Sequence, residues 1–300
     1  MAEGELMSSG NKYSLEHAYR RGVEKLKEAG VPEAQLDAWY LLEHVTGIGR
    51  AAYYADPDRE MSEEHREKYE RCIKIRSRRI PLQHITGEQE FMGLTFLVNE
   101  DVLIPRQDTE ILAETVLDIL SRDEKLYRSE KGHIRLLDMC TGSGCILLSI
   151  LHYAKCEVEG VGSDVSVQAL AVAKQNAKSL EIPAEFIESD LFENITGRFS
   201  MILSNPPYIR SSEIAELQDE VRLYDPIEAL DGREDGLYFY REIITGSPDH
   251  LESGGYLIFE IGCDQAEDVT GMMDAQGFEE IHVKKDLAGL DRVVYGRYIR

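Results

Sequence analysis

The last two thirds of the sequence alternate short apolar runs with longer amphipathic segments, and this alternation limits the possible folds more than any other feature. Runs that suit strands occur at 134–138, 158–164, 185–187, 199–203 and 255–261, with two more near residue 280 and at 292–298. Helical patterns occur at 109–120, after Gly144, at 166–179, around 238–244 and after Gln265. Strands that alternate with helices predict a parallel sheet with helices on both faces. The closing pair suggests an antiparallel edge, so we expect an α/β fold with a doubly wound, mostly parallel sheet of seven strands.

Residues 13–87 have a different pattern, which is typical of helices. Leu15, Tyr19 and Val23 recur at a spacing of four residues, as on one face of a helix. We expect three helices: one that stops at Gly30 and Pro32, one from about Pro32 to Gly47, and one from the N-cap Ser62 to about Arg79. The last ends in a basic group that either suits the helix dipole in solvent or faces a partner, namely Lys74, Arg76, Arg78 and Arg79.

These patterns divide the chain into three parts. Residues 1–87 are expected to form an N-terminal helical domain that holds a partner protein, and residues 108–300 the α/β domain. Residues 88–107 are expected to form a β-hairpin linker, because two short strand-like runs flank Gly93. The apolar run 102–104 is expected to be a further strand that enters a helix at Asp108.

Charge and cysteine content exclude several classes of protein. The formal net charge is −23, of which residues 1–87 carry −1 and residues 88–300 carry −22. An acidic half repels phosphate backbones, so we expect a neutral or basic protein partner and no direct nucleic-acid binding. Five cysteines without a CxxC pair indicate reduced thiols in the cytoplasm, with no disulfide scaffold and no metal site. No apolar run reaches about 18 residues and the polar N-terminus lacks a signal peptide's apolar region, so no membrane segment is expected.

A glycine turn follows the first strand of the expected sheet. It consists of Cys140, Thr141, Gly142, Ser143 and Gly144, and it differs from the dinucleotide motif because Leu147 replaces the third glycine. Glycines allow a ligand to approach the backbone, and Asp164 at the end of the next strand suits a ribose diol. Asp190 and Leu191 follow the third strand, where they can accept from an adenine amino group and pack on its ring. The turn's Asp138 is equally compatible with a structural role or with binding a ligand ammonium group.

The fourth strand ends in Asn205, Pro206, Pro207 and Tyr208. Proline fixes its own φ, has no N–H, and favours an extended residue before it, so this segment is stiff. A planar –NH2 group bound here can give one hydrogen to the Asn205 side chain and one to the Pro206 carbonyl, with Tyr208 on its π face. The alternative is a plain Asx-Pro turn. Four ligand-facing strand ends in succession favour a binding site, because open α/β sheets bind ligands at the carboxyl ends of their strands.

These motifs together resemble the class I S-adenosylmethionine-dependent methyltransferases that act on planar amino groups. Flanking segments at 87–91, 103–106, 220–241 and 254–262 narrow the resemblance to the HemK/PrmC family of protein-(glutamine-N5) methyltransferases, which modify the Gly-Gly-Gln loop of peptide chain release factors. The resemblance extends over about residues 13–300. Two departures are Cys140, where such enzymes usually have glycine, and Gln107, where proline is expected after Arg106. A non-glycine residue at 140 leads us to expect an ordinary backbone conformation there.

The resemblance implies a Rossmann-like methyltransferase domain, S-adenosyl-L-methionine as cofactor with S-adenosyl-L-homocysteine as product, and a monomeric cytoplasmic enzyme of translation termination. The implied cofactor contacts are Cys140, Thr141, Gly142, Ser143, Gly144, Asp164, Asp190, Leu191 and Asn205. The implied catalytic residues are Asn205, Pro206 and Tyr208, and Pro207 joins them in binding the substrate. No general base is needed, because the amide N–H becomes acidic only as the new bond forms. Arg106 and Glu260 are expected to make structural pairs more than cofactor contacts.

Two other functions fit part of this evidence. A nucleic-acid adenine N6-methyltransferase presents the same –NH2 group on a flipped base, but the acidic catalytic half lacks an evident basic groove. A non-catalytic adaptor that binds nucleosides through the glycine turn leaves the segment at Asn205 unexplained.

Overall fold

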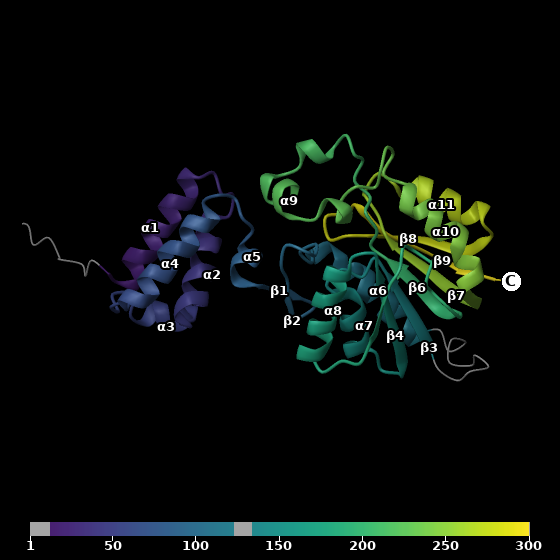
Figure 1. Ribbon diagram of the computed structural model, residues 1–300, viewed down its shortest axis with the longest axis horizontal. Coiled ribbons are helices and arrows are strands. Elements are labelled where there is room, and N and C mark those ends of the chain that lie inside the picture. The colour runs from purple at the N-terminus through teal and green to yellow at the C-terminus, as the bar shows by residue number, and fades with distance from the viewer. Residues whose placement is uncertain (1–12, 123–133, 300) are drawn as a thin grey trace, which may run out of the picture. The chain divides into compact units, whose positions relative to one another are not determined.

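Figure 1 presents a computed structural model of the chain that describes residues 13–122 and 134–299. The chain divides into two compact units, residues 1–87 and 88–300. Each unit has its own apolar core, the first built around Trp39, Tyr53 and Tyr69 and the second on both faces of a sheet. None of the helices in the described ranges combines the length and apolar character that crossing a bilayer requires.

The helices of the first unit are α1 (Leu15–Glu28), α2 (Ala34–Thr46), α3 (Arg50–Ala55), α4 (Glu63–Arg76) and α5 (Leu82–Thr86). The three helices expected from the sequence are confirmed as α1, α2 and α4. Ser62 caps α4 by accepting from the His65 amide at 3.2 Å, and Gly47 ends α2 with a φ of +68°. The short α3 and α5 carry too few turns to give a periodic signal.

Part of the basic group at the end of α4 serves the first unit itself. Arg76 is buried and donates to Asp37 of α2 at 2.7 Å, and it also donates to the Ile80 carbonyl at 3.2 Å. Arg79 donates to the Gly30 carbonyl at 3.0 Å, and its φ of +68° stops the helix before the expected end. These two arginines therefore hold the helices together.

The second unit begins with a hairpin of β1 (Glu88–Phe91) and β2 (Leu94–Leu97). Met92 and Gly93 both have positive φ, 50° and 74°, as the tight turn requires. Residues 88–107 were expected to link the two domains, but they belong to this unit because Phe91 and Phe96 are buried in its core. The expected strand at 102–104 does not form: Val102 packs on α8 (Val167–Ser179), so this run is apolar for a reason other than sheet pairing.

The main sheet has seven strands in the order β5-β4-β3-β6-β7-β9-β8. Their bounds are β3 (Ile134–Met139), β4 (Val158–Asp164), β5 (Glu185–Glu188), β6 (Phe199–Ser204), β7 (Leu251–Glu260), β8 (Phe278–Lys285) and β9 (Asp291–Tyr298). The strands from β3 to β7 pair in parallel, whereas β9 is antiparallel to both neighbours. The predicted mostly parallel, doubly wound sheet with a closing hairpin is thus confirmed.

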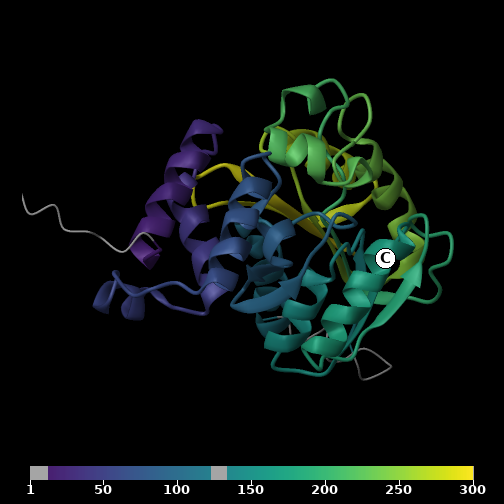
Figure 2. The ribbon, with the colours of Figure 1, turned by 60° about the vertical axis from the view of Figure 1, so that its left-hand side comes forward.

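Helices cover both faces of this sheet (Figures 1 and 2). On one face, Leu136 of β3 packs with α6 (Glu110–Arg122) and α7 (Cys145–Tyr153). On the other, Leu137 packs with α10 (Tyr238–His250) and α11 (Ala266–Ala275). Consecutive strand residues point to opposite faces, which explains why these buried strands read as continuous apolar runs. The long segment between β6 and α10, green in Figure 1, contains only η3 (Ile214–Glu216), α9 (Asp219–Tyr224) and η4 (Ile227–Ala229).

Candidate active site

The register of three adjacent strands brings the predicted site residues to one edge of the sheet. Met139 of β3 lies beside Ser163 of β4 and Ser204 of β6. The residues that follow these strand positions are Cys140, Asp164 and Asn205. The chain turns from β3 to β4 on one side and reaches β6 on the other, so this edge is a topological switch point.

A cleft of about 820 Å³ opens at this edge, within the second unit. Among the predicted site residues it is lined by Cys140, Thr141, Gly142, Ser143, Asp164, Asp190, Leu191, Asn205 and Pro207. Gly144, Pro206 and Tyr208 do not line it. The structure therefore collects most of the predicted cofactor contacts around one cavity, while Gly144, Pro206 and Tyr208 are outside its lining.

Asp138, in the strand that precedes the glycine turn, holds the turn through a hydrogen bond. This carboxylate is fully buried and accepts from the Thr141 hydroxyl at 2.6 Å, while its Oδ1 has no partner among the described residues. Burial raises the pKa of Asp138 to about 7. Of the two roles that the sequence left open, the geometry supports the structural one, because Asp138 does not line the cleft.

Cys140 adopts a φ of +60°, which corrects the expectation of an ordinary conformation at this position. Gly142 and Gly144 have φ of +53° and +78°, so the turn is left-handed at three of its five residues. The Thr141 amide donates to the Ser163 carbonyl at 3.0 Å, which draws the turn toward β4 and forces this path. A side chain in that region costs about 1–2 kcal/mol, so the turn holds strain that a glycine would remove.

Asp164 accepts from the Gly142 amide through Oδ2 and from the Ser166 amide through Oδ1, both at 2.9 Å. Burial raises the pKa of this carboxyl, and the amide hydrogen bonds oppose the rise. Each carboxylate oxygen keeps further acceptor capacity for a ligand hydroxyl on the cleft side. Asp164 thus binds the glycine turn to β4 and remains able to accept from a diol.

The turn after β5 is held by Ser189. Its hydroxyl donates to the Leu191 carbonyl at 2.8 Å and accepts from the Asn194 amide at 3.0 Å. Leu191 has a φ of +48°, and Asp190 is exposed at the cleft. This small network fixes an apolar side chain and a carboxylate beside each other, as an adenine site requires.

After β6, the segment from Asn205 to Tyr208 presents two oxygens without partners. Neither Asn205 Oδ1 nor the Pro206 carbonyl accepts a hydrogen bond from a described residue. The Asn205 side-chain nitrogen donates to the Thr109 hydroxyl at 3.5 Å, a long contact. Pro206 and Pro207 are buried, so the segment cannot swing freely.

The backbone after β6 is also held by hydrogen bonds to residues 230–232. The Ile209 amide donates to the Leu230 carbonyl at 3.0 Å, and the Gly232 amide donates to the Ile209 carbonyl at 2.8 Å. A Cβ at Gly232 would lie 2.7 Å from Tyr208 Cα, so the two backbones pass too close for any side chain at this position. The Gln265 side chain donates to the Tyr208 carbonyl at 3.1 Å from the other side.

Tyr208 packs against one of the two cores of the second unit and does not line the cleft. Its ring packs in the cluster below α10, and its hydroxyl donates to Glu260 Oε1 at 3.4 Å. Glu260, the last residue of β7, is 3% exposed, and burial raises its pKa to about 7. Glu260 does not line the cleft, in keeping with the expected structural pairing.

Arg106 lines the cleft and makes an ion pair. Its guanidinium donates to Asp225 Oδ2 at 2.5 Å, although the two residues are 119 positions apart in the sequence. Asp225 precedes η4, whose residues Ile227 and Glu228 also line the cleft. Arg106 therefore ties the segment after β6 to the start of η1 (Gln107–Thr109).

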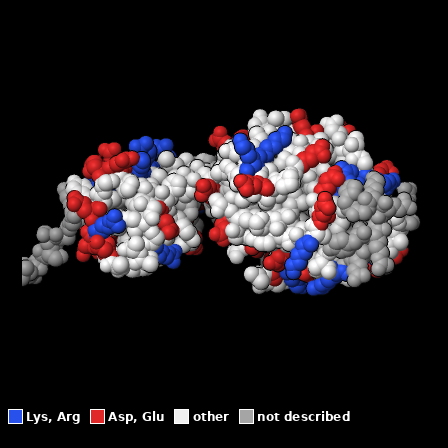
Figure 3. All heavy atoms as spheres, turned by 90° about the horizontal axis from the view of Figure 1, so that it is seen from below, with Lys and Arg blue, Asp and Glu red and all other residues white. Residues whose placement is uncertain are grey.

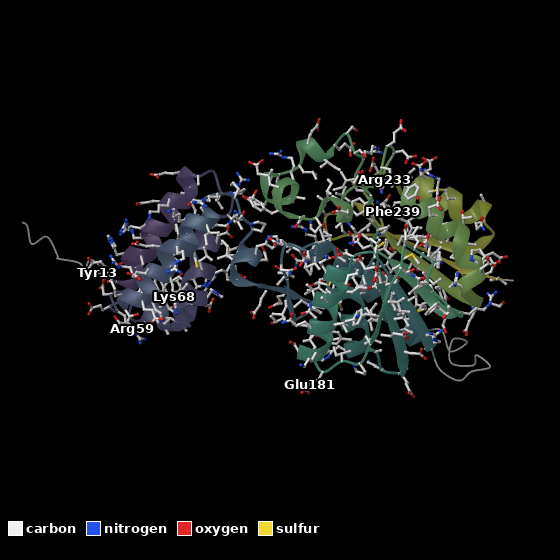
Figure 4. The ribbon with its side chains drawn as sticks, in the orientation of Figure 1. Tyr13, Arg59, Lys68, Glu181, Arg233 and Phe239 are labelled. Atoms are coloured by element: carbon white, nitrogen blue, oxygen red, sulfur yellow. The ribbon has the colours of Figure 1, made fainter. Side chains whose placement is uncertain are left out.

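Sequence reasoning missed one wall of the cleft. It is made by Pro226, Ile227, Glu228, Ala229, Asp231, Arg233 and Phe239; Thr109 and residues 100–103 are further lining residues that sequence reasoning did not select. Figure 4 shows Arg233 beside Phe239, and its guanidinium lies 6.0 Å from that ring. The segment has no periodic pattern, and its residues within 220–241 contribute only to the family resemblance.

The lining of the cleft suits a cationic ligand. Its acidic members are Glu100, Asp101, Asp164, Asp190, Glu228 and Asp231, against two arginines, Arg106 and Arg233. On the face of this unit shown in Figure 3, Lys and Arg form small separate groups with Asp and Glu beside them. A sulfonium nucleoside, with a diol for Asp164 and an adenine for Asp190 and Leu191, fits these carboxylate acceptors; a polyphosphate does not.

Comparisons with known proteins agree with this description. The PrmC N-terminal domain model matches residues 17–87, and the methyltransferase small domain model matches residues 114–221. The release factor glutamine methyltransferase of Clostridium acetobutylicum is 39% identical over 285 residues, 93% of this chain and 97% of that protein. The protein of the same name from Geobacter sulfurreducens is 39% identical over 273 residues, 91% of this chain and 92% of that protein.

Among solved structures, the catalytic domain of hMettl16 in complex with a MAT2A 3′UTR hairpin has a TM-score of 0.53. It is 16% identical in sequence, and the match covers 76% of this chain and 82% of that one. This likeness shows the fold of a class I methyltransferase. The family matches make S-adenosyl-L-methionine the cofactor. With relatives of this similarity over nearly its whole length, the chain belongs to the release factor glutamine methyltransferase family.

Proposed function

We propose that this protein transfers a methyl group from S-adenosyl-L-methionine to the side-chain amide nitrogen of the glutamine in the Gly-Gly-Gln motif of peptide chain release factors, and so supports translation termination. The relatives named for this activity match more than nine tenths of the chain and include both units. The observation that carries the proposal is the pair of unpartnered oxygens on Asn205 and Pro206, held at the sheet edge where the glycine turn also lies.

The two oxygens match the two hydrogens of a carboxamide. An amide nitrogen is a poor nucleophile because its lone pair is delocalised into the carbonyl. Asn205 Oδ1 and the Pro206 carbonyl orient the –NH2 group and stabilise the positive charge that develops on it. The bound cofactor supplies an electrophilic methyl group. The proline pair and the clamp on Gly232 keep this geometry before the substrate arrives, so little reorganisation is needed.

We assign the cofactor to the cleft, with the ribose at Asp164, the adenine between Asp190 and Leu191, and the glycine turn around the amino-acid part. Asn205 completes the contact set. We assign Tyr208, which is outside the cleft lining, to holding the segment through its contacts with Glu260 and Gln265. As the enzyme has no need for a strong base, Glu260 has no proposed role as a proton acceptor.

The direct test is mass spectrometry of a release factor after incubation with the enzyme and cofactor. We expect a mass increase of one methyl group, located on the glutamine of the Gly-Gly-Gln peptide. Duplex DNA and rRNA incubated in parallel test the adenine N6 alternative, which the acidic cleft lining disfavours. Methyl transfer to nucleic acid with none to the release factor overturns the proposal.

We also propose that residues 1–87 recognise the intact protein substrate, and that the enzyme works in the cytoplasm as a monomer without direct nucleic-acid binding. The second unit has its own core, so residues 88–300 can be produced alone. That fragment should lose more activity on an intact release factor than on a short Gly-Gly-Gln peptide. Equal loss on both substrates contradicts a recognition role, and circular dichroism checks that the fragment is folded.

A further inference from the structure

The turn between β8 and β9 presents a large apolar side chain to solvent. Leu287 is 95% exposed, more than any other large hydrophobic residue in the described ranges, and Leu290 in the same turn is 48% exposed. A single exposed leucine needs no explanation by itself, so its place in the fold decides whether it matters. Residues 286–290 are called the β8–β9 tip below.

Hydrogen bonds hold the β8–β9 tip in one conformation. The Asp286 amide donates to the Leu290 carbonyl at 2.8 Å, and the Gly289 amide donates to the Asp286 carbonyl at 2.9 Å. The Asp286 carboxylate accepts from the Leu290 amide at 2.9 Å and from the Arg292 guanidinium at 3.0 Å. The side chain of Asp286 is only 2% exposed. A buried carboxylate thus closes a turn whose leucine is left in solvent, so the shape of the tip does not serve the core.

The strand register places the β8–β9 tip at the edge of the sheet that holds the candidate active site. Ser204 of β6 lies beside Phe259 of β7, and Phe259 lies opposite Val294 of β9. Because β9 is antiparallel to β7, its first residue, Asp291, is at the edge where β6 and β7 end. Neighbouring strands are about 4.8 Å apart, so β9 runs about 10 Å from the strand that leads to Asn205.

Arg292 connects the β8–β9 tip to the cleft lining. Besides its pair with Asp286, its guanidinium donates to the Ile261 carbonyl at 3.3 Å and lies 3.7 Å from the Asp108 carboxylate. Asp108 is in η1, and its neighbour Thr109 lines the cleft. From the tip, the surface of the second unit therefore continues through η1 into the cleft.

A protein that offers a glutamine to this cleft has to cover part of its border. The family to which the chain belongs modifies release factors, which are proteins. A glutamine side chain is short, so the surface around its backbone comes close to the sheet edge. The charges at the tip are already paired, Asp286 with Arg292 and Lys285 with Asp291 at 2.8 Å. What the tip offers a partner is therefore apolar, and covering it gains free energy in proportion to the area removed from water.

We propose that the β8–β9 tip is a docking contact for the protein substrate, in which Leu287 packs on an apolar surface of the release factor beside its Gly-Gly-Gln loop. The inference rests on the proposed function, because a release factor bound at the cleft is what brings such a surface to the tip. Leu287 then contributes to binding of the intact protein and not to methyl transfer itself. A short Gly-Gly-Gln peptide is held by the cleft alone.

Leu287→Ser tests the docking contact, because it removes an apolar side chain that the folded protein leaves in solvent. We expect the KM for an intact release factor to rise about tenfold, as for a contact of moderate importance in an interface, with kcat unchanged. The KM for a short Gly-Gly-Gln peptide and the midpoint of urea unfolding should not change. Leu287→Met, which keeps an apolar side chain of similar volume, should retain most of the wild-type affinity.

Ile299→Ser is the matched control. Ile299 is 47% exposed and follows the last residue of β9, Tyr298, which lies opposite Gly255 at the other end of the strand pair. The control therefore removes an exposed apolar side chain from the same hairpin at the opposite edge of the sheet. Its KM for release factor should equal that of the wild type. An equal rise in both variants, or an equal rise for the short peptide, overturns the docking contact.

Crosslinking gives a readout that does not depend on turnover. A photoreactive amino acid in place of Leu287 should crosslink to the release factor, and the same amino acid in place of Ile299 should not. Mass spectrometry of the crosslinked peptides should locate the contact in the part of the release factor that carries the Gly-Gly-Gln loop. Crosslinks between two copies of this chain would make the tip a contact between protomers and overturn the proposal.

The two readouts separate this inference from the proposed function. If the wild-type enzyme does not methylate the release factor, the proposed function fails, and the crosslink still decides whether the tip binds that protein. If methylation proceeds with no crosslink at position 287 and no change of KM in Leu287→Ser, the proposed function stands and the docking contact is overturned.

Discussion

Arg106, whose side chain is 44% exposed, pairs with Asp225, whose side chain is only 1% exposed. Removing either member therefore leaves its partner in a different environment. Removal of Asp225 leaves an arginine that water can solvate. Removal of Arg106 leaves a buried carboxylate whose Oδ1 already has no partner among the described residues. Burial raises the pKa of Asp225, and the positive charge of Arg106 lowers it by less.

We predict that Arg106→Ala destabilises the protein by about 2–4 kcal/mol at neutral pH, whereas Asp225→Asn costs less than about 1 kcal/mol. Urea unfolding followed by circular dichroism measures both. Asp219→Asn, which removes an exposed carboxylate paired with Arg222 in α9, serves as the control and should have no measurable effect. Equal destabilisation by the first two variants contradicts the asymmetry.

Cys140 offers a test of backbone strain in the glycine turn. Cys140→Ala and Cys140→Gly both remove the thiol and differ only in Cβ. At a φ of +60° the methyl group costs about 1–2 kcal/mol, which exceeds the entropy that glycine loses on folding. We therefore predict that the glycine variant is more stable than the alanine variant by about 0.5–1 kcal/mol in urea unfolding.

Cys145, the first residue of α7, provides the matched comparison. It is also buried, but its φ is negative, so alanine should be the better replacement there by a similar amount. The order of the two variants should thus reverse between the two cysteines. The same order at both positions contradicts strain at Cys140.

The sheet could be predicted from the sequence because buried strands and the helices between them leave strong periodic signals. Its β4 strand has the predicted bounds, and the edge hairpin ends at Tyr298 as expected. The strand prediction at 102–104 was wrong because burial against α8 selects the same apolar residues as a buried strand does. Only tertiary contacts separate the two cases.

The site could be predicted where a residue type has a distinctive backbone preference, as in the glycine turn and the two prolines after Asn205. It was not predictable where the role depends on a partner distant in the chain. Arg106 and Asp225 are 119 positions apart, and neither lies in a pattern that marks the other. The positive φ of Cys140 follows from the path of the turn, which the residue's identity does not encode.

Gly232 is predicted to be intolerant of any side chain. An alanine Cβ would lie 2.7 Å from Tyr208 Cα and 2.8 Å from its carbonyl carbon, so the backbone after Asn205 would have to shift. We expect Gly232→Ala to lower kcat at least tenfold, because a displacement of this kind misplaces the two acceptor oxygens. Steady-state kinetics with a release factor measures the loss.

Gly271 of α11 is the control for that change. No atom lies within 4 Å of a Cβ built there, and its backbone is helical. Gly271→Ala should leave kcat unchanged and raise stability by up to about 1 kcal/mol. If both alanine variants keep full activity, the close approach at Gly232 does not position the site.

Glu260 should make the stability of the second unit depend on pH. Burial raises its pKa from the ordinary value of 4.5 to about 7, so the folded state holds the proton more tightly than the unfolded state. Stability from this group is fully present below pH 4.5 and is lost as pH rises to 7. The shift corresponds to about 3 kcal/mol of unfolding free energy. Asp138, whose pKa is also raised to about 7, lowers stability over the same pH range.

Glu260→Gln should therefore reduce the fall in unfolding free energy between pH 5 and pH 8, measured by circular dichroism in urea. Glu242→Gln, an exposed change on α10, should not. The single tryptophan, Trp39, belongs to the first unit, so its fluorescence follows that unit separately and should be the same in both variants. An unchanged pH slope in Glu260→Gln contradicts the assignment.

Asn205 and Asp164 should divide chemistry from cofactor binding. Asn205→Ala removes one of two acceptors for the substrate amide, so we expect kcat to fall about 10²- to 10³-fold while cofactor affinity changes little. Asp164→Ala removes the carboxylate that accepts from Gly142 and Ser166 and faces the cleft, so cofactor affinity should fall. Calorimetric titration with the cofactor and single-turnover rates at saturating cofactor separate the two effects. Asp164 ends β4 and Asn205 follows the end of β6, so the two side chains lie in one row of the sheet. Position alone therefore cannot account for a difference between them. Equal losses of binding and rate in Asn205→Ala would show that this residue serves the cofactor rather than the glutamine.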